Sequence, residues 1–465
     1  MLAIAGQVPT AEIGTQYHQE VDLKTLFNDV SDYIAELRNP EQLASNVQEA
    51  CRFAVADQAV STLVIPHDCG SSSVSNFPIV PSSDNLSGRI QPTTELMQEL
   101  ATAVAKAKAV TLLVGEGARD SAEMVMQLAE HWQAPIIRSL RAKDIVTEEC
   151  DYLAGGLGLL GDRGGVAAMS DADLVLVLGS DFPYSNWYNK ICRIFQIDKR
   201  SGLLGRRRAG IEGIHGDVAL AVEWLLANTT AKKDDNHLKK VCFSRDTWNK
   251  LLQAKSDPER SKDIIHPQAA ARVLSELAQD DAIFTCDTGA VTVWNARHLK
   301  LRRGQRFTLS FNLASMAYAL PAAIGAQMAY PDRQVISLSG DGGFNMLMGE
   351  LLTAVKYKLP IKVIIFNNGK LGLIQMEQEA EGLPEAETDL QNPDYVALAN
   401  AMGVTSWNVS QPQDLKPVLR EALAKPGPAV VDIKVNPKEL TWPPSINLSQ
   451  AIGFGVSKIK ELLEG

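Results

Sequence analysis

Several patterns that define common classes of protein are missing from this sequence. Its six cysteines include no CxxC pair and its seven histidines no HExxH motif, so we expect neither a zinc site nor a disulfide framework. No apolar run reaches the ~18–20 residues of a membrane-spanning helix. The first residues lack the basic segment and the full apolar core of a signal peptide. We therefore expect a cytoplasmic protein with reduced thiols.

Basic residues are outnumbered by acidic ones, 45 to 55, which gives a formal net charge of −10. This balance disfavours nucleic acid as a partner and disfavours binding to an anionic membrane surface. The hydrophobic and charged contents are those of an ordinary globular chain, which excludes the disordered and collagen-like classes. A chain of 465 residues is long enough for two to four domains.

Short apolar runs alternate with helix-like stretches over most of the chain. They predict strands at 2–5, 61–66, 110–114, 135–138, 173–178, 193–198, 282–286, 334–338, 362–366 and 429–435. Helices are predicted at 40–56, 94–106, 267–279, 316–328 and 344–358. Because such alternation is typical of parallel sheets covered by helices, we expect an α/β fold with two doubly wound parallel-sheet domains. The expected parts are a fragment with a Ser- and Pro-rich linker at 1–90, a central domain at 91–230, a charged, solvated connector with some helix at 231–262 and a C-terminal domain at 263–465.

The most specific pattern lies in QVISLSGDGGFNMLMGELLTAVKYKLPIKVIIFNNGKLGL. A strand leads into Gly340-Asp341-Gly342-Gly343, and a second strand ends at Asn367-Asn368, 27 positions after Asp341. Both clusters are expected just beyond the carboxyl ends of parallel strands, where open α/β sheets bind ligands. Carboxylate, amide and carbonyl oxygens suit Mg²⁺, and glycines let backbone N–H groups approach phosphate oxygens. A GDG turn alone is common, so it is the pairing with NN that predicts a magnesium-bound diphosphate.

This segment resembles the thiamine diphosphate (ThDP) motif of the decarboxylase superfamily. Within the superfamily it is most similar to the flavin-containing pyruvate oxidases, a group that includes the quinone-linked pyruvate dehydrogenases. The similarity extends over essentially the whole chain and includes AIFTCDTGAVTVWNARHLK, SFNLASMAYALPAAIGAQ and LGSDFPYSNWY.

The resemblance implies roles for particular residues. Mg²⁺ would be held by Asp341, Asn368 and the backbone carbonyl of Lys370. Met316 matches the residue that props ThDP in its bent shape, although by itself it is typical of a core methionine. Glu377 matches a carboxylate on the substrate side, although alone it is an ordinary charged helix residue. The other residues expected around the cofactor are Thr288, Gly289, Ala290, Ala314, Ser315, Gly340, Gly342, Gly343 and Gly372.

A weaker signal, Gly115-x-Gly117, follows a strand in the central domain. Asp120 replaces the third glycine of GxGxxG, which disfavours an NAD site, and the residues alone favour a simple strand-to-helix turn. The resemblance implies FAD here, with arginine and lysine neutralising its pyrophosphate and Asp198 accepting from a ribose hydroxyl. Some family members keep this domain without flavin. The candidate FAD residues are Gly115, Gly117, Arg119, Arg141, Lys143, Gly179, Phe182, Pro183 and Asp198.

Three features depart from the pattern of the family. A pyrimidine-binding domain would precede this chain and supply a catalytic glutamate, a position that Glu12, Glu20 and Glu49 do not match; Glu20 is typical of a loop or cap. Leu373 stands where the quinone-linked enzymes have a mobile phenylalanine near the flavin. The final residues, AIGFGVSKIKELLEG, stop short of their amphipathic membrane-binding tail, so we do not expect membrane contact.

The resemblance thus implies ThDP- and Mg²⁺-dependent oxidative decarboxylation of pyruvate or a related 2-oxo acid, with electrons passed through FAD to quinone or another acceptor. It also implies a homo-oligomer, or a partner chain that supplies the pyrimidine-binding domain. Two alternatives stay open: a carboligase of the acetolactate synthase type, and a truncated, non-catalytic paralogue that binds the cofactor. The ASM, QMEQ and DFPY segments favour the oxidase over the carboligase.

Overall fold

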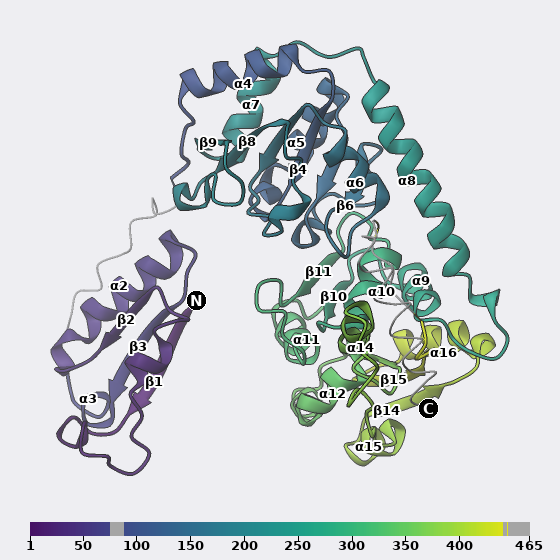
Figure 1. Cartoon of the computed structure of the whole chain (residues 1–465). Helices are drawn as coiled ribbons and strands as arrows, with labels where there is room; N and C mark the ends of the chain where they lie inside the picture. Colours follow the sequence, from purple (N-terminus) through teal and green to yellow (C-terminus); the bar gives the residue numbers. More distant parts are fainter. Residues whose placement is uncertain (75–87, 440–443, 445–465) are drawn as a thin grey trace. The chain divides into compact units, whose positions relative to one another are not determined.

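The computed structural model describes residues 1–74, 88–439 and 444, and the chain divides into two compact units, Met1–Arg89 and Ile90–Gly465 (Figure 1). Two six-stranded parallel sheets in the second unit confirm the predicted α/β class. No helix in the described ranges is long and apolar enough to cross a membrane. Most of the predicted linker and the final residues, AIGFGVSKIKELLEG, lie outside the described residues.

The first unit is a three-stranded parallel sheet in the order β1-β3-β2. Its strand β3 coincides with the predicted strand at 61–66, whereas the short, half-buried β2 was not predicted. The Glu20 carboxylate accepts hydrogen bonds from the backbone N–H groups of Gly14 and Tyr17, which confirms that Glu20 is a loop residue. The elements are β1 (Leu2–Gln7), α1 (Leu23–Phe27), β2 (Tyr33–Glu36), α2 (Leu43–Ala56), β3 (Ser61–Pro66) and α3 (His67–Gly70).

The central sheet has the order β6-β5-β4-β7-β8-β9 and is parallel throughout. Leu112 and Val114 of β4 pack into one apolar cluster, and Leu113 between them packs into another on the opposite face. Both faces are therefore covered, as doubly wound sheets require. The elements are α4 (Thr94–Lys106), β4 (Val110–Val114), α5 (Ala122–Trp132), β5 (Ile136–Arg138), β6 (Leu153–Gly156), α6 (Arg163–Ser170), β7 (Leu174–Leu178), β8 (Arg193–Asp198), β9 (Ile211–His215) and α7 (Val218–Asn228).

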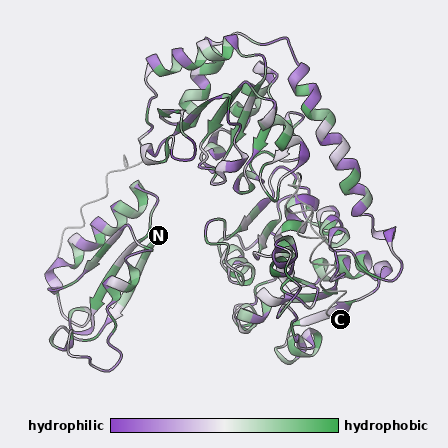
Figure 2. Cartoon of the chain, viewed as in Figure 1, coloured by the Kyte–Doolittle hydropathy of each residue, from purple (hydrophilic) through white to green (hydrophobic). Residues whose placement is uncertain are grey.

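The C-terminal sheet has the order β11-β10-β12-β13-β15-β14 and is also parallel. Ile364 and Phe366 of β13 face one apolar cluster and Val363 and Ile365 the other, and the strands of both large sheets are largely green in Figure 2. The elements are α9 (Pro267–Leu277), β10 (Ile283–Cys286), α10 (Ala290–His298), β11 (Arg306–Leu309), α11 (Ala319–Ala329), β12 (Val335–Gly340), α12 (Asp341–Leu347), α13 (Leu351–Lys356), β13 (Lys362–Asn367), α14 (Gly372–Ala380), α15 (Tyr395–Ala401), β14 (Thr405–Val409), α16 (Pro412–Ala424) and β15 (Ala429–Lys434).

Two of the predicted stretches differ from expectation. The helix predicted at 344–358 is two helices, α12 and α13, separated by a 3₁₀ turn at Met348–Glu350, and α12 begins earlier, at Asp341. The stretch predicted as a solvated connector with some helix does contain a helix, α8 (Asn236–Lys255), but this helix packs against α6 and is partly buried. Its Val241, Trp248 and Leu252 are buried, because apolar side chains at helical spacing gather on one side of an otherwise charged helix.

Candidate cofactor-binding site

Three neighbouring strands of the C-terminal sheet, β10, β12 and β13, end at one cavity of about 290 Å³. Because parallel strands present their carboxyl ends to the same edge, the loops that follow them bring Thr288, Asp341 and Asn368 to its wall. Distant segments of sequence therefore form a single site. The predicted residues that line the cavity are Thr288, Gly289, Ala290, Ala314, Met316, Gly340, Asp341, Gly342, Gly343, Asn368, Lys370, Gly372 and Leu373.

Asp341 is a buried carboxylate held by three N–H donors. Its Oδ1 accepts from the backbone of Gly342 at 3.1 Å, and its Oδ2 accepts from the backbone of Gly369 at 2.7 Å and from Asn392 Nδ2 at 2.8 Å. Burial raises the pKa of Asp341, while these donors oppose that rise. In the described part of the chain no lysine, arginine or histidine forms an ion pair with it.

The turn after β13 supplies the other oxygens of the predicted metal site. Asn368 Oδ1 accepts from the backbone N–H of Lys370 at 3.2 Å. The Lys370 ammonium is turned toward the carboxylates of Glu385 and Asp389. One carboxylate, one amide oxygen and one backbone carbonyl form a donor set that suits Mg²⁺, which takes oxygen ligands and completes its shell with phosphate and water. A buried carboxylate without a cationic partner fits such an ion too.

The close packing of the GDGG turn depends on its glycines. A Cβ atom on Gly343 would lie 2.4 Å from Asp287 Oδ2, and one on Gly342 would lie 3.2 Å from Met316 Cε. The segment around Met316 is itself strained, since Ala314 and Ala317 have positive φ values of 51° and 58°. Such backbone conformations cost roughly 1–3 kcal/mol each and are frequent at functional sites.

Two polar atoms beside the cavity lack protein partners. The Thr288 hydroxyl and Asp287 Oδ2 are buried, and neither forms a hydrogen bond with any residue that the structure describes. Asp287 Oδ1 accepts from the backbone of Ala319 at 2.7 Å, and burial raises the pKa of Asp287 to about 6. Because buried polar atoms are nearly always paired, an unpartnered hydroxyl at a cavity wall indicates a binding site for a polar ligand.

Two predicted site residues lie outside the cavity lining. Ser315 is exposed and its hydroxyl donates to the backbone carbonyl of Met316 at 3.0 Å. Glu377 is exposed on α14, whose Gly372–Met376 segment provides the wall. Their roles stay predictions.

Sequence reasoning did not identify Asn392 and Tyr395, which hydrogen-bond to Asp341, or Asn345, which connects the two. Asn392 Oδ1 accepts from Asn345 Nδ2 at 2.8 Å, and the Tyr395 hydroxyl donates to Asn345 Oδ1 at 2.7 Å. A lone asparagine carries little sequence signal. The one available sign was the NPD turn, whose Asp394 caps the start of α15 by accepting from the N–H groups of Val396 and Ala397.

In the central domain the three candidate glycines contact each other. The Gly117 N–H donates to the Gly179 carbonyl at 2.9 Å, and a Cβ atom on Gly115 would lie 2.4 Å from that carbonyl oxygen. Gly179 has a φ of 56°. These glycines let the loops after β4 and β7 touch. This packing role accounts for the glycines without a ligand, as expected for a simple strand-to-helix turn.

The candidate basic residues of the central domain are engaged with protein groups. Arg119 forms ion pairs with Glu116 at 2.7 Å and Asp144 at 2.9 Å, and Arg141 lies over the ring of Phe311 at 5.8 Å. The buried Lys143 ammonium donates to a backbone carbonyl, that of Ala296, at 3.0 Å, and burial lowers its pKa to about 8. These three residues therefore do not form a cluster of unengaged positive charges.

The remaining candidates of the central domain are placed as follows. Phe182 is buried and packs edge-on against Tyr184 and Tyr188, and Pro183 beside it is exposed. Asp198 is buried at the end of β8 and accepts from the backbone N–H of Arg200 at 2.9 Å. An FAD site in this domain stays a prediction.

Comparison with known proteins defines the class. Residues 287–433 match the C-terminal TPP-binding domain of thiamine pyrophosphate enzymes, and residues 97–225 match their central domain; thiamine pyrophosphate is another name for ThDP. The chain belongs to the thiamine pyrophosphate enzyme family and is a ThDP-dependent enzyme.

Individual relatives share most of their length with this chain. YdaP of Bacillus subtilis, named as a thiamine pyrophosphate-containing protein, is 34% identical over 466 residues, which cover 100% of this chain and 80% of YdaP. The acetolactate synthase large subunit of Pyropia yezoensis is 31% identical over 98% of this chain and 80% of its own. The pyruvate oxidase of Lactiplantibacillus plantarum is 26% identical over 93% of this chain and 73% of its own.

Proposed function

We propose that the cavity at the ends of β10, β12 and β13 binds ThDP with Mg²⁺ and that the enzyme decarboxylates pyruvate or a related 2-oxo acid. The observation that carries the proposal is the convergence of three groups on one cavity: the buried Asp341 carboxylate, which has no cationic partner among the described residues, the Asn368 amide, and the Thr288 hydroxyl, which has no hydrogen-bond partner among them. When bound, ThDP supplies a carbanion that adds to the carbonyl carbon of a 2-oxo acid.

The residues of the chain would divide the binding task by their chemistry. Asp341, Asn368 and the Lys370 carbonyl would hold Mg²⁺, and the Thr288 hydroxyl would donate to the cofactor. The first turn of α10 opens on the cavity at Ala290, where the positive end of the helix dipole favours phosphate charge. Met316, between two strained alanines, would support the organic part of the cofactor.

The wall contributed by α10 and α14 is mostly apolar. Val291 and Trp294 come from α10, and Leu373, Ile374 and Met376 come from α14. Such side chains exclude water from the reacting atoms, which strengthens every electrostatic interaction within the site. Leu373 would thus act as an apolar wall residue.

The first candidate for the overall reaction is that of the pyruvate oxidases. Pyruvate and water would give acetate and carbon dioxide, and two electrons would pass through FAD in the central domain to quinone or another acceptor. The ASM, QMEQ and DFPY segments and the pyruvate oxidase relative support this choice.

The second candidate is carboligation, in which two pyruvate molecules give acetolactate and carbon dioxide. It is favoured by the higher identity to the acetolactate synthase large subunit of Pyropia yezoensis, 31% against 26% for the pyruvate oxidase. Under either candidate we propose a homo-oligomer, or a complex with a chain that supplies the pyrimidine-binding domain; the mass of the purified assembly tests this.

One experiment separates the candidates. The purified full chain is incubated with ThDP, Mg²⁺ and pyruvate, and carbon dioxide, acetolactate, flavin absorbance and reduction of an electron-accepting dye are measured. Dye reduction with acetate assigns the oxidase, and acetolactate assigns the carboligase. Calorimetry on the wild type and on Asp341→Asn tests the site, since the variant should lose Mg²⁺-dependent ThDP binding. Binding without carbon dioxide release would indicate the non-catalytic paralogue, and equal binding by both proteins would refute the site.

A further inference from the structure

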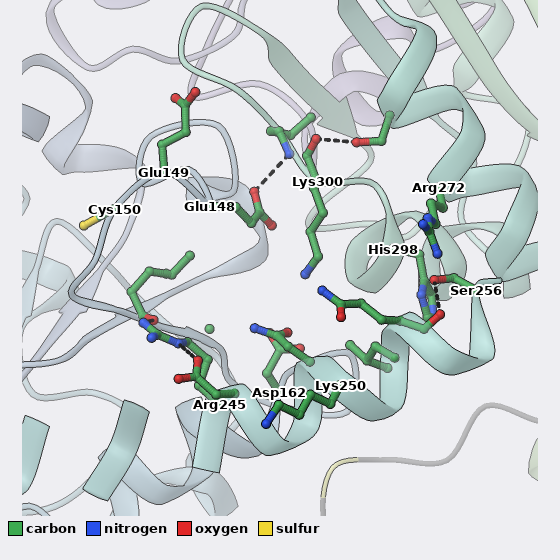
Figure 3. A pocket seen from close by; sticks show the side chains of 18 of the residues that line it. Glu148, Glu149, Cys150, Asp162, Arg245, Lys250, Ser256, Arg272, His298 and Lys300 are labelled. Atoms are coloured by element: carbon green, nitrogen blue, oxygen red, sulfur yellow. Dashed lines mark hydrogen bonds and ion pairs between the residues drawn. The ribbon is translucent and has the colours of Figure 1, made fainter. Parts of the chain in front are cut away.

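A second cavity, of about 980 Å³, lies apart from the ThDP cavity and shares no lining residue with it. Residues of α8, of α9, of the end of α10 and of the segment around β6 surround it (Figure 3). We call it the α8 cavity. Its lining includes Glu148, Lys250, Arg272, His298 and Lys300. A volume of this size suits a small organic ligand rather than a lone ion.

Two lysines of the α8 cavity have no counter-charge in direct contact. Figure 3 shows the Lys300 side chain extending across the middle of the cavity and the Lys250 side chain on α8 at its lower rim. Among the described residues, neither ammonium group forms a hydrogen bond or an ion pair. Lysine is a mobile point charge that readily meets phosphate oxygens.

The lining holds seven carboxylates and six lysine and arginine side chains, and Glu148, the carboxylate on the wall beside Lys300, is already engaged by other groups. Glu148 is shared by Arg138 at 2.5 Å and Lys143 at 3.4 Å, and its other oxygen accepts from the backbone N–H of Leu301 at 2.9 Å. Although burial alone would raise its pKa, Arg138, Lys143 and Lys300 hold the pKa of Glu148 well below its usual range. Glu148 is therefore less able to neutralise Lys300.

His298 is a buried ring without a partner at the same wall. It is 6% exposed, and no hydrogen bond or ion pair joins its ring to another described residue. Burial, together with Lys300, Arg297 and Lys143, lowers the pKa of His298 to about 3. The imidazole is therefore neutral at ordinary pH, with an N–H that can donate to an anion at a point of positive potential.

Several carboxylates of the lining are already engaged. Asp162 accepts from Trp248 Nε1 at 3.1 Å and from a backbone N–H group, Asp246 pairs with Arg245, and Glu276 pairs with Arg272. They are thereby less able to neutralise the two lysines.

We propose that the α8 cavity binds a small phosphate-bearing anion through Lys300, Lys250 and the His298 N–H. Two ammonium groups and a neutral donor match an oxyanion of more than one charge better than a single carboxylate. The site goes beyond the proposed catalytic function and rests on different residues.

The test is a titration of the full-length protein, loaded with ThDP and Mg²⁺, with inorganic phosphate and with glycerol phosphate, followed through the His298 NMR signal. Potassium chloride at matched ionic strength controls for screening. We expect a saturable shift and a weakening of roughly tenfold, about 1.4 kcal/mol, in Lys300→Met and in Lys250→Met. The exposed Lys190→Met serves as the matched control and should bind as the wild type does.

The outcomes separate the sources of the ligand. Tighter binding of glycerol phosphate assigns a phosphorylated organic molecule, and equal binding assigns free phosphate. An unmoved His298 signal, a shift reproduced by chloride, or equal losses in Lys190→Met and Lys300→Met would overturn the proposal. Unchanged unfolding midpoints of the lysine variants verify that they are folded.

Discussion

Asn392 Nδ2 donates a hydrogen bond of 2.8 Å to Oδ2 of Asp341, a residue 51 positions earlier in the chain. The same Nδ2 lies 3.2 Å from Asn367 Oδ1, so Asn392 connects the ends of β12 and β13. A proposed metal ligand is thereby fixed in orientation by a neighbouring amide. Such supporting residues orient metal ligands and affect metal affinity.

Replacing this amide should weaken the metal site without removing a ligand. We expect Asn392→Ala to lower the affinity for Mg²⁺ roughly 10–100-fold, because the Asp341 carboxylate loses a fixed donor. Magnesium titration of ThDP binding measures the effect. Asn186→Ala, at an exposed asparagine of the central domain, is the matched control. Equal magnesium affinity in Asn392→Ala and the wild type would contradict the role of this residue.

Substitutions of two threonines should have different effects, one on cofactor binding and the other on stability. The Thr288 hydroxyl has no partner among the described residues, whereas the Thr285 hydroxyl donates to the Ala319 carbonyl at 2.7 Å. Thr288→Val should leave the unfolding midpoint nearly unchanged and weaken ThDP binding roughly tenfold. Thr285→Val should cost about 0.5–1.5 kcal/mol of stability, because it removes a buried hydrogen bond to the first carbonyl of α11. Calorimetry and urea unfolding give the two readings, and the reverse pattern would refute the assignment.

The glycine at 343 should tolerate no side chain. Gly343→Ala places a Cβ atom against Asp287 and should destabilise the protein by roughly 1–3 kcal/mol, as overpacking does. Gly349, on the neighbouring 3₁₀ turn, has no atom within 4 Å of an added Cβ. Gly349→Ala should therefore be neutral or slightly stabilising. Urea unfolding of both variants checks this, and equal midpoints would show that the turn adjusts.

Asp287 should make stability depend on pH. Its folded pKa of about 6 lies above the ordinary value of 3.8, so the folded state favours the protonated carboxyl. That contribution is fully present below about pH 4 and is lost as the pH rises to about 6, roughly 3 kcal/mol in all. Asp287→Asn should therefore gain stability relative to the wild type between pH 4 and 7. A constant difference between their unfolding midpoints over this range would contradict the expectation.

Removing Asp144 should cost more stability than removing Arg306, one of its two arginine partners. Its carboxylate is almost fully buried and lies 2.9 Å from both Arg119 and Arg306, whereas Arg306 is half exposed. Asp144→Ala should cost roughly 2–3 kcal/mol, since it leaves Arg119 without one of its partners and the backbone of Phe307 without an acceptor. Arg306→Met should cost less than about 1 kcal/mol, as exposed pairs do. Thermal unfolding of both variants measures the two losses of stability, and equal losses would contradict the prediction.

The sequence was sufficient for the frame of the fold and the centre of the site. Apolar runs predicted the central strands, and β4 and β8 coincide with their predicted bounds. GDGG and NN indicated one sheet edge, because parallel strands that follow each other through a helix end on the same side. Strands at or near sheet edges, such as β9, β11 and β14, were missed, since half-exposed strands of four or five residues carry little apolar signal.

Only the tertiary structure decided which polar side chains meet. Asn392 was not identified from the sequence, yet it supports Asp341. Arg119 and Lys143 were expected to neutralise a pyrophosphate and are instead engaged with Glu116, Asp144 and the Ala296 carbonyl. The physical reason is the distance along the sequence over which each kind of interaction acts. Apolar periodicity is local and can be read along the chain, whereas the partner of a buried polar group is set by desolvation among segments distant in sequence.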